Sequence, residues 1–372
     1  MRVIAFLLRV GLVVAVVAGV LTLLVDDGGT RPGAARAAPV TRTTSQSPTP
    51  TRAVPSGTFT FSAVGDVMMG STPNLPPDGG ASYFGAVAPS IRADVALANL
   101  EGTLSTGGYS KCGVGSTSCF AFHTPPSYAR WLRRAGFSIA NLANNHAADY
   151  GPVGQQQTLA ALRSQRLLHT GRPGEITVQT THGVRVAVIG FAPYPWAQSL
   201  TDIPAAKRLV ARARERADVV VVTMHAGAEG TSHLHVRPGT ETFLGENRGN
   251  PLAFAHAVVD AGADLVVGSG PHVLRGIEWY RDRLIVYSLG NFGGYGAFSL
   301  GGSLETTAIL RAKLRGDGRI VAARLVAVRL VGAGVPVLDR TGAAYALVRS
   351  LSRDDFGSAG ARVSATGRIT HA

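Results

Sequence analysis

The sequence predicts an α/β protein whose folded body begins near residue 58. From Thr58 onward, short apolar runs typical of strands alternate with helical stretches, and most of these runs end in polar, glycine-rich clusters. The chain has 372 residues, 45% of them hydrophobic, which is enough to bury a core in one large or two ordinary domains. A separate apolar segment precedes this body at the N-terminus.

Residues 3–25 are apolar apart from Arg9 and a few small residues. A helix of this length spans about 35 Å, compared with about 30 Å of hydrocarbon, so we expect a single transmembrane helix. Arginines at its start and Asp26–Asp27 after it predict a cytoplasmic N-terminus and a body outside the cytoplasm. The alternative for residues 1–27 is a cleaved signal segment, which would make the protein secreted, because Ala35-Arg36-Ala37 has the small-x-small form of a cleavage site.

Residues 28–57 are rich in Pro, Ser, Thr, Gly and Ala and lack large apolar side chains, which predicts a disordered linker. Cys112 and Cys119 are the only cysteines, and they lie close together in the sequence. In an oxidising compartment, we expect them to form a loop-closing disulfide rather than a zinc site.

The formal net charge of +13 favours anionic partners such as phosphates, polycarboxylates or lipid headgroups. No run of Lys and Arg is interleaved with aromatic residues, so we do not expect a nucleic-acid partner.

Six predicted strands of the body end in polar clusters, and a seventh, residues 185–191, ends in the aromatic loop APYPWA. The six strands cover residues 59–64, 95–98, 137–140, 219–223, 264–267 and 284–288. A helix is predicted to open at Thr124–Pro125–Pro126 and to end at Gly136, and another to begin after Gly151–Pro152.

Ligand sites in α/β sheets form beyond the carboxyl ends of strands. Each polar residue there could by itself be an ordinary turn, helix-cap or core residue. Because such residues follow six strands, turn chemistry alone does not explain them. The residues that we expect at one edge are Asp66, Asn99, Glu101, Asn145, His146, His225, Glu229, His272 and Asn291. Oxygen and imidazole ligands without thiolates suit one or two divalent ions, with Mn, Zn or Fe expected.

Six motifs in this order resemble the bacterial capsule synthesis and poly-γ-glutamate synthesis family, which is CapA-like: GDVMMG, NLEGTLS, NNHAADYG, HAGAE, PHVLRGIEWY and YSLGNF. The resemblance covers about Phe59 to Leu330. It implies the calcineurin-like metallophosphoesterase architecture, a four-layer α/β-β/α sandwich. We therefore expect this domain over residues 58–335, followed by a partly disordered C-terminal extension over residues 336–372.

The resemblance also implies roles for the site residues. Asp66, Glu101 and His272 would hold one ion, while Glu101, Asn145 and His225 would hold the other. His146 would be the catalytic acid, with Asp149 and Gly151 shaping the turn around it. The remaining candidates are expected to bind substrate: Asn99, Glu229, Asn291 and Arg248.

Two positions depart from the pattern of the wider phosphoesterase fold. Met68 stands where that fold has a histidine, and a thioether is a poor ligand for hard ions. Gly270 stands where many relatives have the first histidine of His-Pro-His. The two metal positions would therefore each lack one histidine, so one ion, or none, is an alternative to two.

Three functions remain as hypotheses from the sequence. The first is a divalent-metal-dependent hydrolase of an extracellular phosphoester or of an amide in an anionic polymer. The second is a protein of capsule or poly-γ-glutamate synthesis or export, working with that machinery at the cell membrane through residues 3–25. The third is a non-catalytic domain in which the cluster only holds loops together.

Overall fold

The computed structural model describes residues 55–113, 119–297 and 300–372. The predicted anchor (3–25) and the predicted linker up to residue 54 lie outside these residues. Across the described ranges, no helix is long and apolar enough to cross a membrane.

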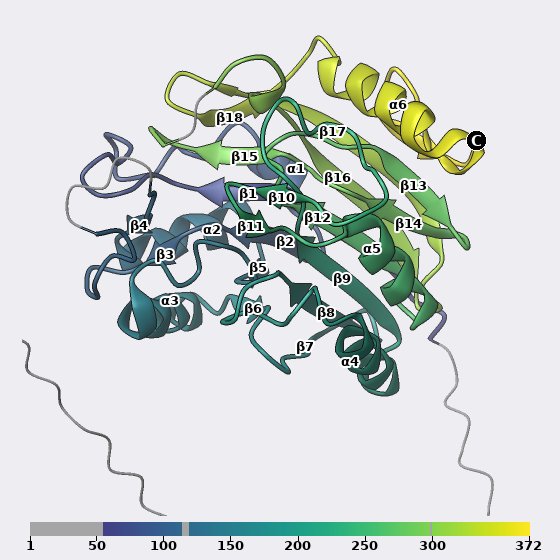
Figure 1. Cartoon of the computed structure of the whole chain (residues 1–372), viewed down its shortest axis with the longest axis horizontal. Helices are drawn as coiled ribbons and strands as arrows, with labels where there is room; N and C mark the ends of the chain where they lie inside the picture. Colours follow the sequence, from purple (N-terminus) through teal and green to yellow (C-terminus); the bar gives the residue numbers. More distant parts are fainter. Residues whose placement is uncertain (1–54, 114–118, 298–299) are drawn as a thin grey trace, which may run out of the picture. The chain divides into compact units, whose positions relative to one another are not determined.

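The larger sheet has ten strands, and its main path runs β19-β20-β17-β16-β1-β2-β5-β6, with β15 paired to β1 and β18 to β17 (Figure 1). Its parallel part contains β1 (Thr58–Met68), β2 (Val95–Leu100), β5 (Ile139–Asn141), β6 (Leu168–Thr170) and β15 (Asn291–Gly294). Its antiparallel part contains β16 (Thr306–Arg315), β17 (Ile320–Val331), β18 (Val335–Leu338), β19 (Arg362–Val363) and β20 (Arg368–Thr370).

The second sheet has six strands in the order β13-β14-β12-β9-β8-β7. They are β7 (Thr177–Thr181), β8 (Val184–Phe191), β9 (Val219–His225), β12 (Leu265–Ser269), β13 (Ile277–Tyr280) and β14 (Arg283–Val286). Two short ladders lie apart from these sheets, one of β3 (Thr103–Leu104) with β4 (His123–Thr124) and one of β10 (Thr242–Phe243) with β11 (Glu246–Asn247).

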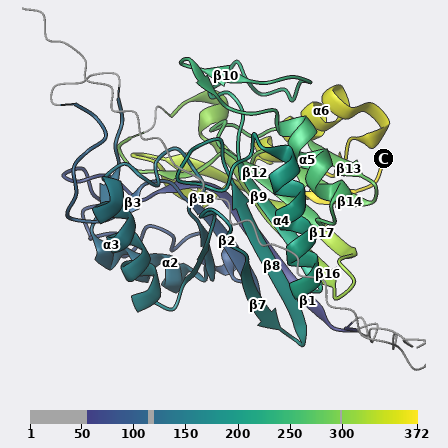
Figure 2. The ribbon, with the colours of Figure 1, turned by 60° about the horizontal axis from the view of Figure 1, so that its bottom comes forward.

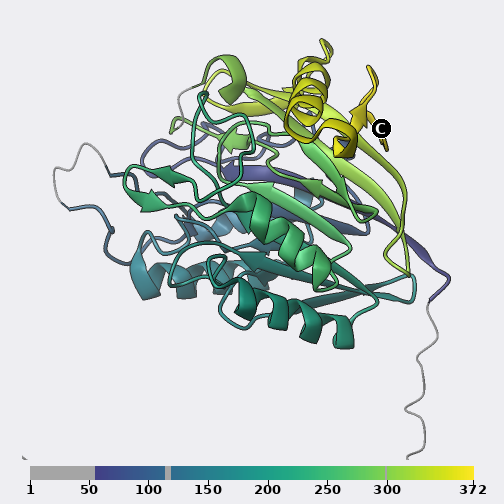
Figure 3. The ribbon, with the colours of Figure 1, turned by 45° about the vertical axis from the view of Figure 1, so that its right-hand side comes forward.

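The two sheets pack face to face, and helices cover their outer faces. Buried apolar side chains from both sheets form the central core. Helices α1 (Ala88–Ile91), α2 (Ala129–Ala135) and α3 (Gly151–Ser164) pack on the larger sheet. Helices α4 (Ile203–Arg216) and α5 (Pro251–Asp260) lie side by side on the smaller sheet (Figure 3). The layers are therefore helix, sheet, sheet and helix, which matches the predicted layer order.

The helix boundaries follow the expected sequence signals. The 3-10 turn η1 (Pro126–Tyr128) leads into α2, and Gly136 ends α2 with φ 111°, a left-handed conformation that glycine adopts without steric cost. Helix α3 begins at Gly151 with Pro152 in its first turn. Both predicted helices are thus present.

The C-terminal segment differs from the predicted, partly disordered extension. Strand β20 pairs with β17 inside the larger sheet. Helix α6 (Ala343–Phe356), labelled in Figure 1, buries Ala344, Val348 and Leu351. These three residues recur at helical spacing, so they form one apolar face that packs into the domain, with Ala344 and Val348 in the central core. Residues 336–372 are therefore part of the domain rather than an addition to it.

The carboxyl ends of β1, β2 and β9 position the predicted cluster. Figure 2 shows the ribbons of β1 and β2, which belong to the larger sheet, and of β9, which belongs to the smaller one. The cluster therefore lies where the two sheets meet. Gly270, just after β12, donates its backbone N–H to Asp66 Oδ2 at 3.2 Å, which joins the two sheets at this point.

Candidate metal centre

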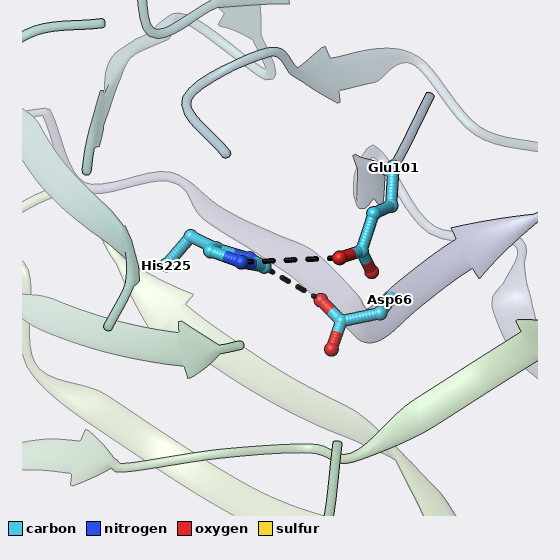
Figure 4. A group of neighbouring side chains, drawn as sticks. All are labelled: Asp66, Glu101 and His225. Atoms are coloured by element: carbon cyan, nitrogen blue, oxygen red, sulfur yellow. Dashed lines mark ion pairs between the residues drawn. The ribbon is translucent and has the colours of Figure 1, made fainter. Parts of the chain in front are cut away.

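Asp66, Glu101 and His225 form a compact buried triad, and their ligand atoms lie within 4.8 Å of one another. His225 Nδ1 is 3.5 Å from Asp66 Oδ1, and His225 Nε2 is 3.9 Å from Glu101 Oε1 (Figure 4). All three side chains are almost fully buried. Two carboxylates and one imidazole are the donor set expected for a divalent ion such as Mn, Zn or Fe.

The carboxylate of Glu101 is the clearest sign that this triad fits a cation. Both of its oxygens are buried, and neither has a hydrogen-bond partner in the described part of the chain. A buried carboxylate that accepts no hydrogen bond is costly, and proteins usually pair such groups closely or use them to coordinate metals. The residues present therefore fit the metal that the sequence predicted.

The protonation states also fit metal ligands. Burial opposes ionisation of Asp66, but hydrogen bonds with His225 and His272 outweigh it and hold the pKa of Asp66 well below its usual range. Burial lowers the pKa of His225 to about 4, so the imidazole is neutral at physiological pH. Burial and the neighbouring Asp66 carboxylate raise the pKa of Glu101 well above its ordinary value. A cation between the two carboxylates would remove this unfavourable interaction.

The side chain of Asn99 positions two members of the triad, Asp66 and His225. Its Nδ2 donates to Asp66 Oδ1 at 2.8 Å and lies 3.2 Å from His225 Nδ1. Its Oδ1 accepts from Asn141 Nδ2 at 2.8 Å and from Asn144 Nδ2 at 3.1 Å. Because Asn99 is only 2% exposed, the geometry supports a positioning role and not the substrate contact predicted for it.

His272 lies beside the triad rather than within it. Its Nδ1 is 3.1 Å from Asp66 Oδ2 and 2.8 Å from Asn291 Oδ1, and its Nε2 is 3.8 Å from Glu101 Oε1. Burial favours the neutral ring, but the charges of Glu101 and Asp66 raise the pKa of His272 to about 10. Asn291, 1% exposed, orients this ring and is not accessible to a substrate in this arrangement.

Arg248, predicted from the sequence to bind substrate, is buried beside the triad. Its Nη1 lies 2.7 Å from Glu229 Oε1 and donates to Tyr194 Oη at 2.8 Å. Its Nε donates to the Gly227 carbonyl, and Nη2 lies 3.5 Å from His225 Nε2. At 1% exposed, Arg248 is a fixed positive charge, whereas the side chain of Glu229 is 18% exposed and remains accessible.

His146 forms a pair with Asp149, whose Oδ2 lies 2.7 Å from His146 Nδ1. Burial lowers the pKa of His146, and the hydrogen bond with Asp149 offsets only part of this shift. Asp149 is fully buried and also accepts from the backbone N–H of Phe122 at 2.7 Å and pairs with Lys111 Nζ at 2.7 Å. The predicted Cys112–Cys119 disulfide is present and lies between these two contacts in the sequence.

Asn145 and the two departures from the family pattern can also be placed. The Asn145 Oδ1 atom is buried and accepts no hydrogen bond among the described residues, as a metal ligand would before binding. Met68 is buried in the core, and its sulfur accepts from Gly70 N at 3.2 Å. Gly270 has φ 109°, and a Cβ there would lie 2.9 Å from Ala226 N, so the local backbone excludes a histidine.

Sequence reasoning missed Asn141 and Asn144 as members of the site, and it gave Asp149 the shaping of a turn but not the pairing with His146. The two asparagines could have been recognised because an asparagine also ends the neighbouring predicted strand, residues 95–98. For Asp149, the signal was its position three residues after His146, which places both on one side of a helical turn.

The comparisons with known proteins agree with the motifs. The family model described as "Bacterial capsule synthesis protein PGA_cap" matches residues 60–294. The capsule biosynthesis protein CapA of Bacillus anthracis is 33% identical over 215 residues, which cover 51% of this chain and 47% of that protein. The PGA biosynthesis protein CapA of Bacillus subtilis (strain 168) is 32% identical over 251 residues, which cover 62% of each chain. The matched region thus spans about half to three fifths of these relatives.

Solved structures are more distant. A hypothetical protein from Thermus thermophilus has a TM-score of 0.46 at 20% identity, covering 72% of this chain and 98% of that one. A 5'-nucleotidase precursor from the same organism has a TM-score of 0.41 at 15% identity, covering 76% and 54%. These scores are too low to bear on the chemistry of the site. The family model, by contrast, matches more than half of the chain, and the chain therefore belongs to the bacterial capsule synthesis protein (PGA_cap) family.

Proposed function

We propose that this protein acts in the synthesis or export of a capsule or of poly-γ-glutamate, and that Asp66, Glu101 and His225 hold a divalent cation. Family membership supports the first part. The single observation that carries the second is the buried Glu101 carboxylate, whose two oxygens accept no hydrogen bond from the described residues. Asn145, His272 and Glu229 surround this triad and would complete the coordination or position the bound polymer.

We further propose that the body lies outside the cytoplasm and is tethered through residues 3–25. The length of that apolar segment and its flanking charges support this location. The disulfide between Cys112 and Cys119 supports an oxidising compartment. Protease treatment of intact protoplasts tests the topology, because the body should be degraded while cytoplasmic proteins remain intact.

Metal analysis of the purified full-length chain tests the metal centre. Wild type dialysed against Mn or Zn should retain at least one ion per chain, and Asp66→Ala should lose it. Asp78→Ala, at an exposed aspartate in a surface turn, is the matched control and should retain the ion. Wild type without bound metal would overturn the metal centre and leave a metal-free binding role.

A second candidate function is hydrolysis of a phosphoester or amide, and the His146–Asp149 pair favours it. A cation here would act as a Lewis acid on the scissile group. Asp149 orients the ring through Nδ1, so that Nε2 can accept a proton or, once the ring is protonated, donate one to a leaving group. Turnover of a generic phosphodiester or of poly-γ-glutamate by the metal-loaded protein tests this candidate.

A further inference from the structure

Three arginines lie in register on one face of the larger sheet. Arg311 of β16 is opposite Arg324 of β17, and Arg324 is opposite Arg368 of β20. Lys313, two residues after Arg311 on β16, projects to the same face. We call these four residues the cationic row. Like charges that face each other across strands destabilise a sheet, so this arrangement reduces the stability of the fold.

Most of the cationic row has no partner within the protein. Lys313, Arg324 and Arg368 are exposed, and their side chains make no ion pair or hydrogen bond with any described residue. Arg311 differs because its Nη1 donates to the carbonyl oxygens of Ser90 and Arg92 at the end of α1. Three cations are therefore left for an external partner.

The cationic row contributes to the lining of a groove of about 830 Å³. Arg319 adds a fifth positive charge to the lining, and Trp279 adds an aromatic wall. Asp282 is the only acidic residue among the described residues that line it. The groove is at the opposite end of β1 from the metal centre, since Thr60 lines it and Asp66 belongs to the triad. The two positions are six residues apart along the strand, a distance of about 20 Å.

We propose that this groove binds an extended polycarboxylate chain, with carboxylates paired to Arg324, Arg368 and Lys313. Neighbouring strands are about 4.8 Å apart, so the row presents cations at a repeat that an extended chain with regularly spaced carboxylates can match. A groove admits a single chain, whereas a flat bilayer contacts protruding groups. The inference rests on the proposed function only for the choice of poly-γ-glutamate as the polymer.

Binding of fluorescently labelled poly-γ-glutamate to the full-length protein in detergent tests the groove. The double variant Arg324→Gln/Arg368→Gln should bind roughly tenfold or more weakly, with a smaller dependence of affinity on salt. Its melting temperature should be equal to or above that of wild type, because the change removes repulsion. Arg208→Gln/Arg212→Gln on the exposed face of α4 removes the same charge and should leave polymer binding unchanged.

Metal content separates this proposal from that of the metal centre. Arg324→Gln/Arg368→Gln should lose polymer binding while its metal content stays at the wild-type level, and it should lose polymer binding in the same way if wild type proves to hold no metal. Equal loss in the groove and α4 variants would show a non-specific charge effect and overturn the proposal. Loss of binding to vesicles with anionic lipids, with polymer binding intact, would assign the row to a membrane surface instead.

Discussion

The Nδ1 atom of His146 lies 2.7 Å from Oδ2 of Asp149, three residues further along the chain. Asp149 is in turn fixed by Lys111 and by the backbone of Phe122, on either side of the disulfide-closed loop. A carboxylate held in this way fixes both the tautomer and the orientation of an imidazole. In the proposed hydrolase, this pairing would orient His146 for proton transfer, apart from the triad of Asp66, Glu101 and His225.

If the protein is a hydrolase, replacing His146 should affect chemistry without affecting metal content. His146→Ala should lower turnover by about 10²–10⁴-fold, the contribution of a positioned acid, while bound metal stays at the wild-type level. His182→Ala, at an exposed histidine, is the control and should leave both unchanged. Turnover and metal stoichiometry measured on the same samples provide the test. A variant that loses its metal would contradict the assigned role.

Glu101→Gln should show effects of opposite sign with and without metal. In chelator, the variant should melt at or above the temperature of wild type, because it lacks a buried carboxylate that accepts no hydrogen bond. With Mn at about 100 times its Kd, wild type should gain about 2.7 kcal/mol and the variant far less. Calorimetry with and without chelator measures both. Glu215→Gln on α4 is the exposed control. An equal stabilisation by Mn in wild type and both variants would contradict the assignment of Glu101 as a metal ligand.

Much of this fold and site could be predicted from the sequence. Parallel strands place their carboxyl ends together, so Asp66, Glu101 and His225 could be grouped before the strand order was known. Proline and glycine signals located α2 and α3 because they act over a few residues. The short separation of Cys112 and Cys119 similarly predicted the disulfide.

Hydrogen-bond partners far apart in the sequence could not be predicted in this way. Asn99 bonds both Asp66 and Asn141 because the register of three strands brings them together, and no local pattern specifies that register. Arg248 is buried because its loop folds back onto Glu229 and Tyr194, although the loop composition is that of an exposed turn. The C-terminal segment was misjudged because its glycines and charges mask a short apolar face.

Asn99→Ala should destabilise the protein even without metal. The change leaves Asp66 without one buried donor and removes the acceptor shared by Asn141 and Asn144, at a cost of about 2–3 kcal/mol. Urea denaturation in chelator measures this loss. Asn74→Ala, at an exposed asparagine, should change stability by less than about 0.5 kcal/mol. If Asn99→Ala were as stable as wild type and only weakened polymer binding, the substrate-contact role would be restored.

Leu351→Ala tests whether the C-terminal segment belongs to the domain. Leu351 is 3% exposed on the inner face of α6, so its truncation should cost about 2–4 kcal/mol through lost burial and a residual cavity. Leu338→Ala is the matched control, because Leu338 is 45% exposed and should tolerate the same truncation at a small cost. Denaturant unfolding of both variants should show one cooperative transition, shifted only for Leu351→Ala, because α6 shares the central core with both sheets. Two separate transitions, or no shift for Leu351→Ala, would mean that residues 336–372 form an independent extension after all.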